Sequence, residues 1–578
     1  MPTTRPLRAL AALVTTILLV AACGADDDAD PDAAEPGDTS AETSTPTSDD
    51  DPSPVVGGEI VVGLSGETPS YLPGAATVAA PGFHVAMAIF DPIAARGADG
   101  QIHPFVAESI VPDADATEWT VRLRDGITFH DGTALDAEVM REIFYEYLAP
   151  DTSTLSGDVA QVSDVRVDDD LTFTYVLSEP NAAFADLLTG PVGWPFSVDA
   201  CRAAGDDCGA QIAGTGPFRL ESWVRDSELV VERNQDYWRT DADGTPIPYL
   251  DRITFRPIPD NAARWLSVES GTIDAGHTFQ AETVARARDA DGVDTYEWIG
   301  NGGGYTALNT LEPPLDDVRV RRALQMAVDQ EQLIAVLGGE GISPPLSQLW
   351  GDDSEWFSPV VRDAWSDPDV AAATALIDEY VEDPTRSDGE RPGEPVRVTY
   401  QSGADPTILQ GAQYYQAAWG AIGVETQIDS TQQATLIGNV IGSADQQPPF
   451  RGTFQASLFG TPGEGDPYTL IRGLFGDPTT QPMNASNHTS DAIARNLEVL
   501  RTSTDFDERY AANQAVMLEV ADEVPVIWHG AVVGSIYTRS ALRNVAGWTI
   551  PGSGGDDIAG SGVAHARTHW SHVWLDAG

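Results

Sequence analysis

Few residue patterns in this sequence could support chemistry, and each of them also fits a structural role. His565, His569 and His572 lie close together near the C-terminus, among glycine and serine residues. No carboxylate is placed to complete a ligand set around them, so the pattern predicts an exposed chain end and no metal site. Asp168-Asp169-Asp170 lies between two predicted strands, where a solvated turn is expected.

The motifs of nucleophilic and nucleotide-dependent enzymes are missing. No G-x-S-x-G nucleophile elbow occurs. The glycine-rich run 300–304 and the segment 214–218 both lack the spacing of a dinucleotide-binding loop, and the first fits a flexible crossing between lobes. All 32 basic residues are arginine, which excludes Schiff-base enzymes and the phosphate-binding P-loop. The sequence therefore predicts a protein that is not an enzyme and needs no cofactor.

The length and net charge of the chain limit the number of lobes and the kinds of partner that can be expected. A chain of 578 residues exceeds the roughly 250–300 residues that one hydrophobic core serves, so two or more lobes are expected. The 89 acidic and 32 basic residues give a net charge of −57, which would repel nucleic acid and anionic lipid. This acidity fits either a GC-rich genome or a salty habitat.

The N-terminus predicts export and anchoring. Residues 1–22 combine a short basic start with an apolar run too short to span a bilayer, as in a secretory signal peptide. Small residues directly before Cys23 resemble the lipobox of bacterial lipoproteins, although an ordinary signal peptide with a chance cysteine is the alternative. Residues 23–56 are acidic and rich in Ser, Thr and Pro, which predicts a disordered tether. The expected location is extracytoplasmic, lipid-anchored to the outer face of the cell membrane.

Two further cysteines, Cys201 and Cys208, fit such a compartment. They are close in sequence, with Gly205 and Gly209 beside them. A local disulfide is favoured in an exported protein. A reactive thiol pair is the weaker alternative, because no histidine or basic cluster accompanies them.

Hydrophobic periodicity predicts an α/β body that begins near residue 57. Alternating apolar residues predict strands around 119–123 and 173–177, and a short apolar run predicts another at 59–64. Thr133 and Asp136 predict a capping box before a helix that extends to Tyr147. Later expected elements are helices at 318–337, 370–381, 406–422, 491–501 and 507–521, and strands at 396–400, 424–428 and 524–528.

One long segment carries a family resemblance. Residues 118–135, EWTVRLRDGITFHDGTAL, resemble the signature of family 5 solute-binding proteins, the oligopeptide- and dipeptide-binding components of ABC importers. The resemblance continues in the same order on both sides. The matching segments are FDP at 90–92, PFVAES at 104–109, GTGPF at 214–218, RNQDYW at 233–238 and LDDVRVRRAL at 315–324.

The resemblance implies an α/β, two-lobe, periplasmic-binding-protein-like (type II) fold with an extra N-terminal subdomain. Ligand would be caught in a cleft at the hinge between lobes, which close around it. The implied divisions are lobe I at 57–80, 165–304 and 530–578, the extra subdomain at 81–164, and lobe II at 305–529.

The resemblance also implies which parts of the chain contact the ligand. They are the loops after two strands, the crossing into lobe II, and a position where the family often has an aromatic residue against the ligand. The corresponding residues are Tyr71, Tyr305, Asn309, Gln432, Phe459, Gly460, Thr461, Glu464 and Asp466. Peptide binders of the family carry an aromatic-Asp segment that pairs with the peptide amino terminus. That pattern is missing here, and only Glu464 or Asp466 could supply the carboxylate.

The resulting prediction is a monomeric solute-binding lipoprotein that captures a peptide and delivers it to ABC permease subunits, with no nucleic-acid partner. An oligosaccharide is the alternative cargo within the same family. A secreted hydrolase on an unrecognised scaffold is a second alternative, and a receptor that signals without transport is a third.

Overall fold

The structure is a computed structural model that describes residues 53–442, 448–460, 465–552, 557–564 and 567–576. The predicted signal peptide, Cys23, the tether up to residue 52, Thr461, Glu464 and His565 lie outside the described residues. Among the described helices, none combines the length and the apolar character needed to cross a bilayer.

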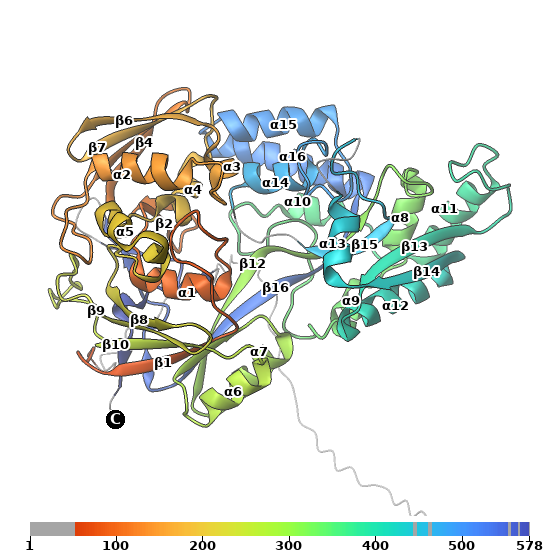
Figure 1. The fold of residues 1–578 in the computed structure, drawn as a ribbon. Coiled ribbons are helices and arrows are strands. Elements are labelled where there is room, and N and C mark those ends of the chain that lie inside the picture. Colours follow the sequence, from red (N-terminus) through yellow and green to blue (C-terminus); the bar gives the residue numbers. More distant parts are fainter. Residues whose placement is uncertain (1–52, 443–447, 461–464, 553–556, 565–566, 577–578) are drawn as a thin grey trace, which may run out of the picture. The chain divides into compact units, whose positions relative to one another are not determined.

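A ten-stranded sheet is the main framework. Its strands are β1 (Glu59–Leu64), β8 (Phe218–Val224), β9 (Glu228–Arg233), β10 (Arg252–Pro257), β11 (Ala275–Thr278), β12 (Val293–Leu308), β13 (Val396–Gly403), β14 (Val424–Thr431), β15 (Ala456–Gly460) and β16 (Val526–Arg539). Their order is β14-β13-β15-β12-β16-β11-β1-β10-β9-β8. The two longest, β12 and β16, pair antiparallel at the centre and run from one group of elements to the other (Figure 1). We call residues up to 299 and from 532 the first lobe, and residues 300–531 the second lobe.

The first lobe adds a four-stranded sheet in the order β4-β5-β7-β6. Its further elements are α1 (Ala80–Ile89), β2 (Ala94–Arg96), β3 (Ile102–Pro104), β4 (Ala107–Pro112), β5 (Glu118–Leu123), α2 (Ala137–Ile143), η1 (Phe144–Leu148), α3 (Ser156–Val159), β6 (Val162–Asp169), β7 (Thr172–Leu177), α4 (Phe184–Leu187), η2 (Pro191–Gly193), α5 (Val198–Ala204), η3 (Gly205–Ala210), α6 (Asn261–Glu269), α7 (Ala281–Arg288), β17 (Leu542–Arg543), β18 (Thr549–Ile550), β19 (Ile558–Ala559), η5 (Trp570–His572) and β20 (Trp574–Leu575). The predicted subdomain boundary at residue 164 falls inside β6, which pairs with β7, and β7 in turn pairs with β5.

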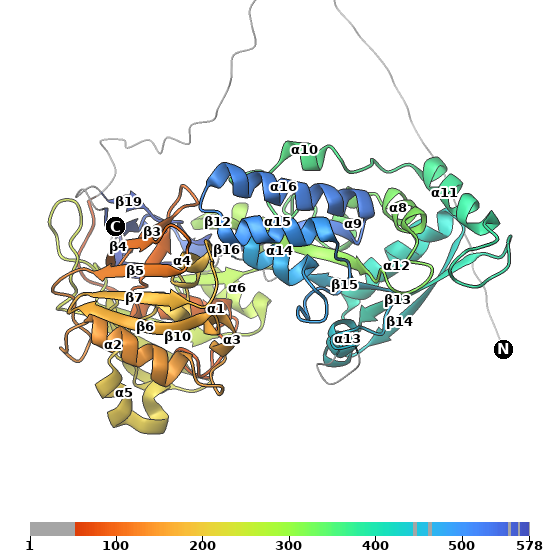
Figure 2. The same ribbon diagram turned by 90° about the horizontal axis from the view of Figure 1, so that it is seen from above.

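The second lobe places helices around the other end of the ten-stranded sheet. They are α8 (Val318–Met326), α9 (Gln330–Val336), α10 (Pro359–Arg362), α11 (Val370–Glu382), α12 (Pro406–Ala421), α13 (Gln433–Ile441), α14 (Pro467–Phe475), α15 (Asp491–Thr502) and α16 (Phe506–Glu523). Figure 2 shows α14, α15 and α16 side by side. The predicted α/β character of this lobe is confirmed.

Three local predictions differ from the structure. The expected helix over 318–337 is two helices, because the Asp329 side chain caps a new start by accepting from Gln332 N at 3.0 Å. Asp136, and not Thr133, caps α2, and the Thr133 hydroxyl donates to Asp131 instead. The glycine-rich run at 300–304 is part of strand β12, with register shifts against β16.

A buried carboxylate connects several of the family-like segments. Asp91, fully buried, accepts from Trp238 Nε1 at 2.7 Å and from Tyr237 Oη at 3.1 Å. The Asp91 backbone N–H donates to Thr215 Oγ1 at 3.3 Å. His569 Nε2 lies 3.1 Å from the same carboxylate. The segments FDP, GTGPF and RNQDYW therefore hold the first lobe together, as their mainly structural character would require.

The predicted exposed C-terminus is wrong. His569 is fully buried and His572 is 7 % exposed, because this segment packs into the first lobe beside Asp91 and Ser571. A carboxylate does lie next to His569, but its other hydrogen bonds go to tyrosine and tryptophan. Burial lowers the pKa of both histidines, so the neutral rings act as hydrogen-bonding core residues.

Cys201 and Cys208 form a disulfide that links α5 to the following 3₁₀ turn. Both cysteines are buried. Gly205 ends α5 with φ +59°, which lets the chain reverse between them.

Candidate ligand-binding cleft

A cavity with a volume of about 1180 Å³ lies between the two lobes. The first lobe contributes the β2–β3 hairpin and α4, and the second lobe contributes the segment 353–356 and the starts of α14 and α16. Its polar and aromatic wall residues include Arg96, Asp99, Gln101, Trp119, Asp186, Glu297, Trp298, Asp353, Glu355, Trp356, Asp466, Phe506 and Arg509. We call it the interlobe cavity. A cavity of about 210 Å³ beside it shares Arg96, Asp186 and Gly465.

A chain of charged groups joins the lobes at its edge. Arg96 Nη2 of the first lobe lies 2.6 Å from Asp186 Oδ1. The other oxygen of Asp186 accepts from the backbone N–H of Asp466 at 3.1 Å, across the lobe boundary. Arg509 Nη2 lies 2.5 Å from Asp466 Oδ1. Both carboxylates thus have an arginine partner, and one hydrogen bond connects the two pairs.

Further contacts join the lobes nearby. The Gln101 amide donates to the Glu355 carboxylate. Arg501 Nη1 donates to the carbonyl oxygen of Pro180 at 2.8 Å, and the backbone N–H of Ala182 donates to the carbonyl oxygen of Arg501 at 2.7 Å. The described conformation therefore has the two lobes in direct contact beside the cavity.

The cavity keeps an excess of negative charge. Glu297 pairs with Arg288 at 2.6 Å, and Asp99 lies 2.9 Å from His103. Among the described residues, Asp353 has no hydrogen-bond or ion-pair partner, and the one partner of Glu355 is the neutral Gln101 amide. Burial raises the pKa of the Glu355 carboxyl above its usual value, and the nearby positive charge of Arg96 opposes that shift without forming an ion pair with Glu355.

Aromatic side chains form the rest of the surface. Trp298 and Trp356 are each 8 % exposed, whereas Phe506 is 41 % exposed. The rings of Trp356 and Phe506 lie 4.9 Å apart, and the Arg509 guanidinium lies 5.4 Å from the Trp356 ring centre. Such rings offer both apolar contact and attraction for a cation. The cavity thus suits a partly apolar ligand with a cationic group.

Among the predicted ligand-binding residues that the structure describes, Asp466 lines the interlobe cavity. Its carboxylate is already used by Arg509, and it also caps α14 by accepting from Tyr468 N at 2.8 Å. Arg509 of the protein therefore supplies, in this conformation, the cationic partner that was predicted to come from a ligand. Burial raises the pKa of Asp466, and Arg509 opposes that shift.

The other predicted residues that the structure describes lie away from this cavity. Tyr71 packs on Trp223 in the first-lobe core, with ring centres 5.1 Å apart, and Tyr305 packs on Phe459 and Trp528 in the second-lobe core. Asn309 is fully buried and donates to the carbonyl oxygen of Phe454 at 2.9 Å.

Gln432 and Gly460 are exposed, one at the start of α13 and one at the end of β15. Neither lines the interlobe cavity. Of the wall residues named above that sequence reasoning missed, only Trp119 belongs to a quoted motif, the family signature at 118–135. The available signal was the run 352–356, in which three acidic residues come just before Trp356.

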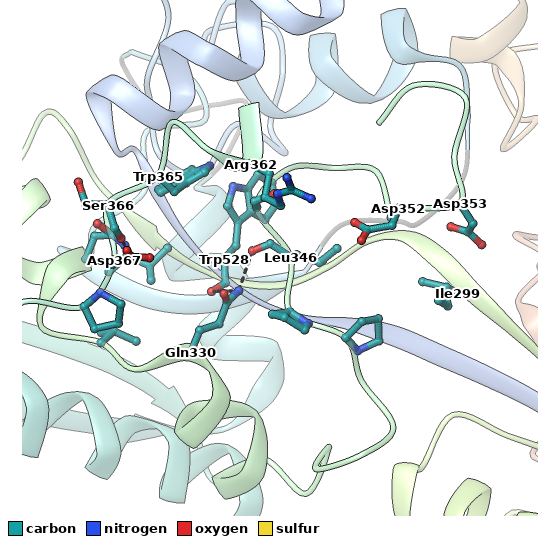
Figure 3. Close-up of a pocket in the computed structure, with 18 residues that line it drawn as sticks. Ile299, Gln330, Leu346, Asp352, Asp353, Arg362, Trp365, Ser366, Asp367 and Trp528 are labelled. Atoms are coloured by element: carbon teal, nitrogen blue, oxygen red, sulfur yellow. Dashed lines mark hydrogen bonds between the residues drawn. The ribbon is translucent and has the colours of Figure 1, made fainter. Parts of the chain in front are cut away.

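A further cavity of about 450 Å³ lies in the second lobe (Figure 3). We call it the second-lobe cavity. Its walls include Ile299, Gln325, Val328, Gln330, Pro344, Pro345, Leu346, Ser347, Asp352, Asp353, Arg362, Trp365, Ser366, Asp367, Pro368, Ile527 and Trp528. Ile299 and Asp353 line the interlobe cavity as well, so the two cavities are neighbours.

Comparison with known proteins agrees with this architecture. The sequence model of the bacterial extracellular solute-binding proteins, family 5 Middle, matches residues 101–481. The glutathione-binding protein GsiB of Salmonella paratyphi A is 22 % identical over 460 residues, which are 79 % of this chain and 85 % of that protein. The dipeptide-binding protein of Escherichia coli K12 is 26 % identical over 489 residues, covering 78 % and 84 % of the two chains.

A solved structure shows the same fold. The periplasmic binding protein DppA from Helicobacter pylori, in complex with the peptide STSA, superposes with a TM-score of 0.68 at 19 % identity. The match covers 90 % of this chain and 98 % of that one. The predicted α/β, type II periplasmic-binding-protein-like fold is confirmed.

Proposed function

Because the chain belongs to the family 5 bacterial extracellular solute-binding proteins, we propose that it captures a peptide between its two lobes and delivers it to the permease of an ABC importer. The observation that carries this proposal is the interlobe cavity, whose walls come from both lobes. Its volume of about 1180 Å³ is slightly above the range of about 300–1,000 Å³ for small-molecule pockets, which leaves room for a peptide.

The charge of the cavity favours a peptide over a neutral sugar. Among the described residues, neither Glu355 nor Asp353 is in an ion pair, although the charge of Arg96 lies close enough to Glu355 to lower its pKa. A peptide amino terminus would supply a cationic partner, and enclosing an unpaired charge would otherwise be costly. The names of relatives that bind dipeptides and glutathione support the same class of cargo. A neutral oligosaccharide would leave the part-buried Glu355 carboxylate without an ion-pair partner, whereas Asp353 is exposed to water.

Retention of peptides tests the proposal. The purified protein is incubated with a mixed tripeptide library, an N-acetylated copy of that library, and a mixture of neutral oligosaccharides. After gel filtration, bound molecules are released and identified by mass spectrometry. We expect peptides with a free amino terminus to be retained and the acetylated ones to be depleted. Retention of oligosaccharides without peptides would support the alternative cargo.

We also propose that Cys23 carries a lipid that holds the protein, as a monomer, on the outer face of the cell membrane. Support comes from the family, which is extracellular, and from the acidic tether in the sequence. Cys23→Ala should release the protein from the membrane fraction with its melting temperature unchanged, because the folded body begins beyond the tether. Membrane attachment of this variant would contradict the lipid anchor.

A further inference from the structure

The second-lobe cavity has the properties of a small-molecule pocket. Its volume of about 450 Å³ lies within the range of about 300–1,000 Å³ for such pockets. Apolar side chains dominate its walls, among them Leu346, Trp365, Ile527 and Trp528. An apolar group that left water for this surface would gain free energy in proportion to its buried area.

Hydrogen bonds and ring packing fix the positions of several wall residues of the second-lobe cavity. The Gln330 side-chain amide donates to the carbonyl oxygens of Leu346 and His529, both at 2.6 Å, and the first bond is drawn in Figure 3. Trp528 is 4 % exposed and packs on the Tyr305 ring at 5.8 Å. A wall fixed in this way is formed before any ligand arrives, which reduces the entropy lost on binding.

The cavity borders the proposed cargo site. Ile299 and Asp353 belong to the walls of both cavities. Figure 3 shows these two residues at one end of the second-lobe cavity, together with Asp352, while Trp365, Ser366 and Asp367 lie at the other end. A group that enters from the cargo site would therefore pass Asp353 first and meet the tryptophan rings further in.

The charges around the cavity select against an acidic group. Asp352, Asp353 and Asp367 lie on its walls. The one arginine of the wall, Arg362, already pairs with Asp363 at 2.9 Å. A carboxylate placed here would meet like charges, whereas the quadrupoles of the indole rings favour another aromatic ring.

We infer that the second-lobe cavity is a subsite that receives an aromatic side chain of the cargo. This inference rests on the proposed function, because it needs a cargo whose main body lies in the interlobe cavity. It names Leu346, Ser347, Trp365 and Trp528 as residues that determine specificity.

The test compares tripeptides that differ at one position, with tryptophan, alanine or glutamate there, each placed in turn at the three positions. Dissociation constants are measured by calorimetry. For one placement, the tryptophan peptide should bind at least tenfold more tightly than the alanine peptide, and the glutamate peptide should bind no better than the alanine one. Burial of one aromatic ring accounts for such a factor.

Filling the cavity should remove the preference. Ser347→Phe places a ring inside it and is expected to bring the tryptophan and alanine peptides within threefold of each other. Ser366→Phe, at the exposed end of the cavity, is a second filling variant in case the first does not fold. The matched control, Val360→Phe, adds a ring at a position that is 55 % exposed and lies outside the described walls of both cavities.

The possible results distinguish failure of the aromatic subsite from failure of the proposed peptide-binding function. If tripeptides bind but tryptophan gives no advantage at any position, or if the advantage survives in the filled variants, the subsite is refuted and the proposed function stands. If no tripeptide binds the parent protein, the proposed function fails, and the subsite fails with it.

Discussion

Replacing Arg509 with leucine is expected to destabilise the second lobe by about 3–5 kcal/mol near neutral pH, the range for removing one partner of a buried ion pair. Asp466 and Arg509 are each about 10 % exposed in their side chains, so water could not replace the lost guanidinium. The Asp466 carboxylate would remain buried beside Asp186, whose charge opposes it. The variant would also lose the contact of the guanidinium with the Trp356 ring.

The loss should depend on pH in a definite direction. The pKa of Asp466 is raised above its usual value, chiefly by burial, so the folded protein holds this proton more tightly than the unfolded chain. Where the folded state binds more protons, stability falls as the pH rises through the raised pKa. Removing Arg509 raises that pKa further, because the arginine lowers it. The stability difference between parent and variant should therefore be smaller at pH 4 than at pH 7.

Urea unfolding at the two pH values measures both effects. The matched control is Arg286→Leu, which breaks an exposed pair with Glu282 on α7 and should change stability little. A loss for Arg509→Leu no larger than that of the control would contradict a structural role for the pair. An equal loss at pH 4 and pH 7 would show that Asp466 is not the group left unpaired.

Gly303→Ala is expected to be the most damaging single methyl addition at the crossing between lobes. A Cβ at this position would lie 2.5 Å from the carbonyl oxygen of Gly530 and 3.1 Å from the Cα of Ala531, both on the neighbouring strand β16. Backbone atoms cannot rotate away as a side chain can, so β12 and β16 would have to separate. Overpacking of this kind costs about 1–3 kcal/mol.

Function should suffer as well as stability. β12 and β16 are the paired strands that connect the lobes, so a shift between them would misplace one wall of the interlobe cavity relative to the other. Weaker cargo binding is therefore expected alongside a lower unfolding midpoint.

Gly300→Ala is the control, because the nearest atom to its Cβ, the carbonyl oxygen of Val532, would lie 3.5 Å away in ordinary contact. If both variants unfold at the same urea concentration and bind cargo alike, close approach at Gly303 does not constrain the crossing.

Much of the fold could be predicted from the sequence because it depends on local patterns. The strand at 59–64 matches β1 and the helix at 507–521 lies within α16, since apolar runs and hydrophobic periodicity depend on residues that are close in sequence. The break at Asp329 was missed because apolar spacing continues across it. The buried C-terminus was missed because its partner Asp91 is far away in sequence.

The site was harder to predict for the same reason. Arg96, Asp186, Asp466 and Arg509 form one connected group, yet they come from four separate elements, and their sequence context gives no sign of the pairing. Asp466 was found through the family resemblance. The resemblance could not reveal that a neighbouring helix supplies the cation for it.

We expect a bound peptide to lie in the interlobe cavity with its charged amino terminus at Glu355. Calorimetric titration of one retained tripeptide and its N-acetylated form tests it, on the parent protein and on Glu355→Gln, with Glu282→Gln as an exposed control on α7. The free peptide should bind Glu355→Gln at least tenfold more weakly than it binds the parent, equivalent to about 1.4 kcal/mol, while the acetylated peptide should bind both alike. Equal affinity of the free peptide for the parent and for Glu355→Gln would contradict the claim.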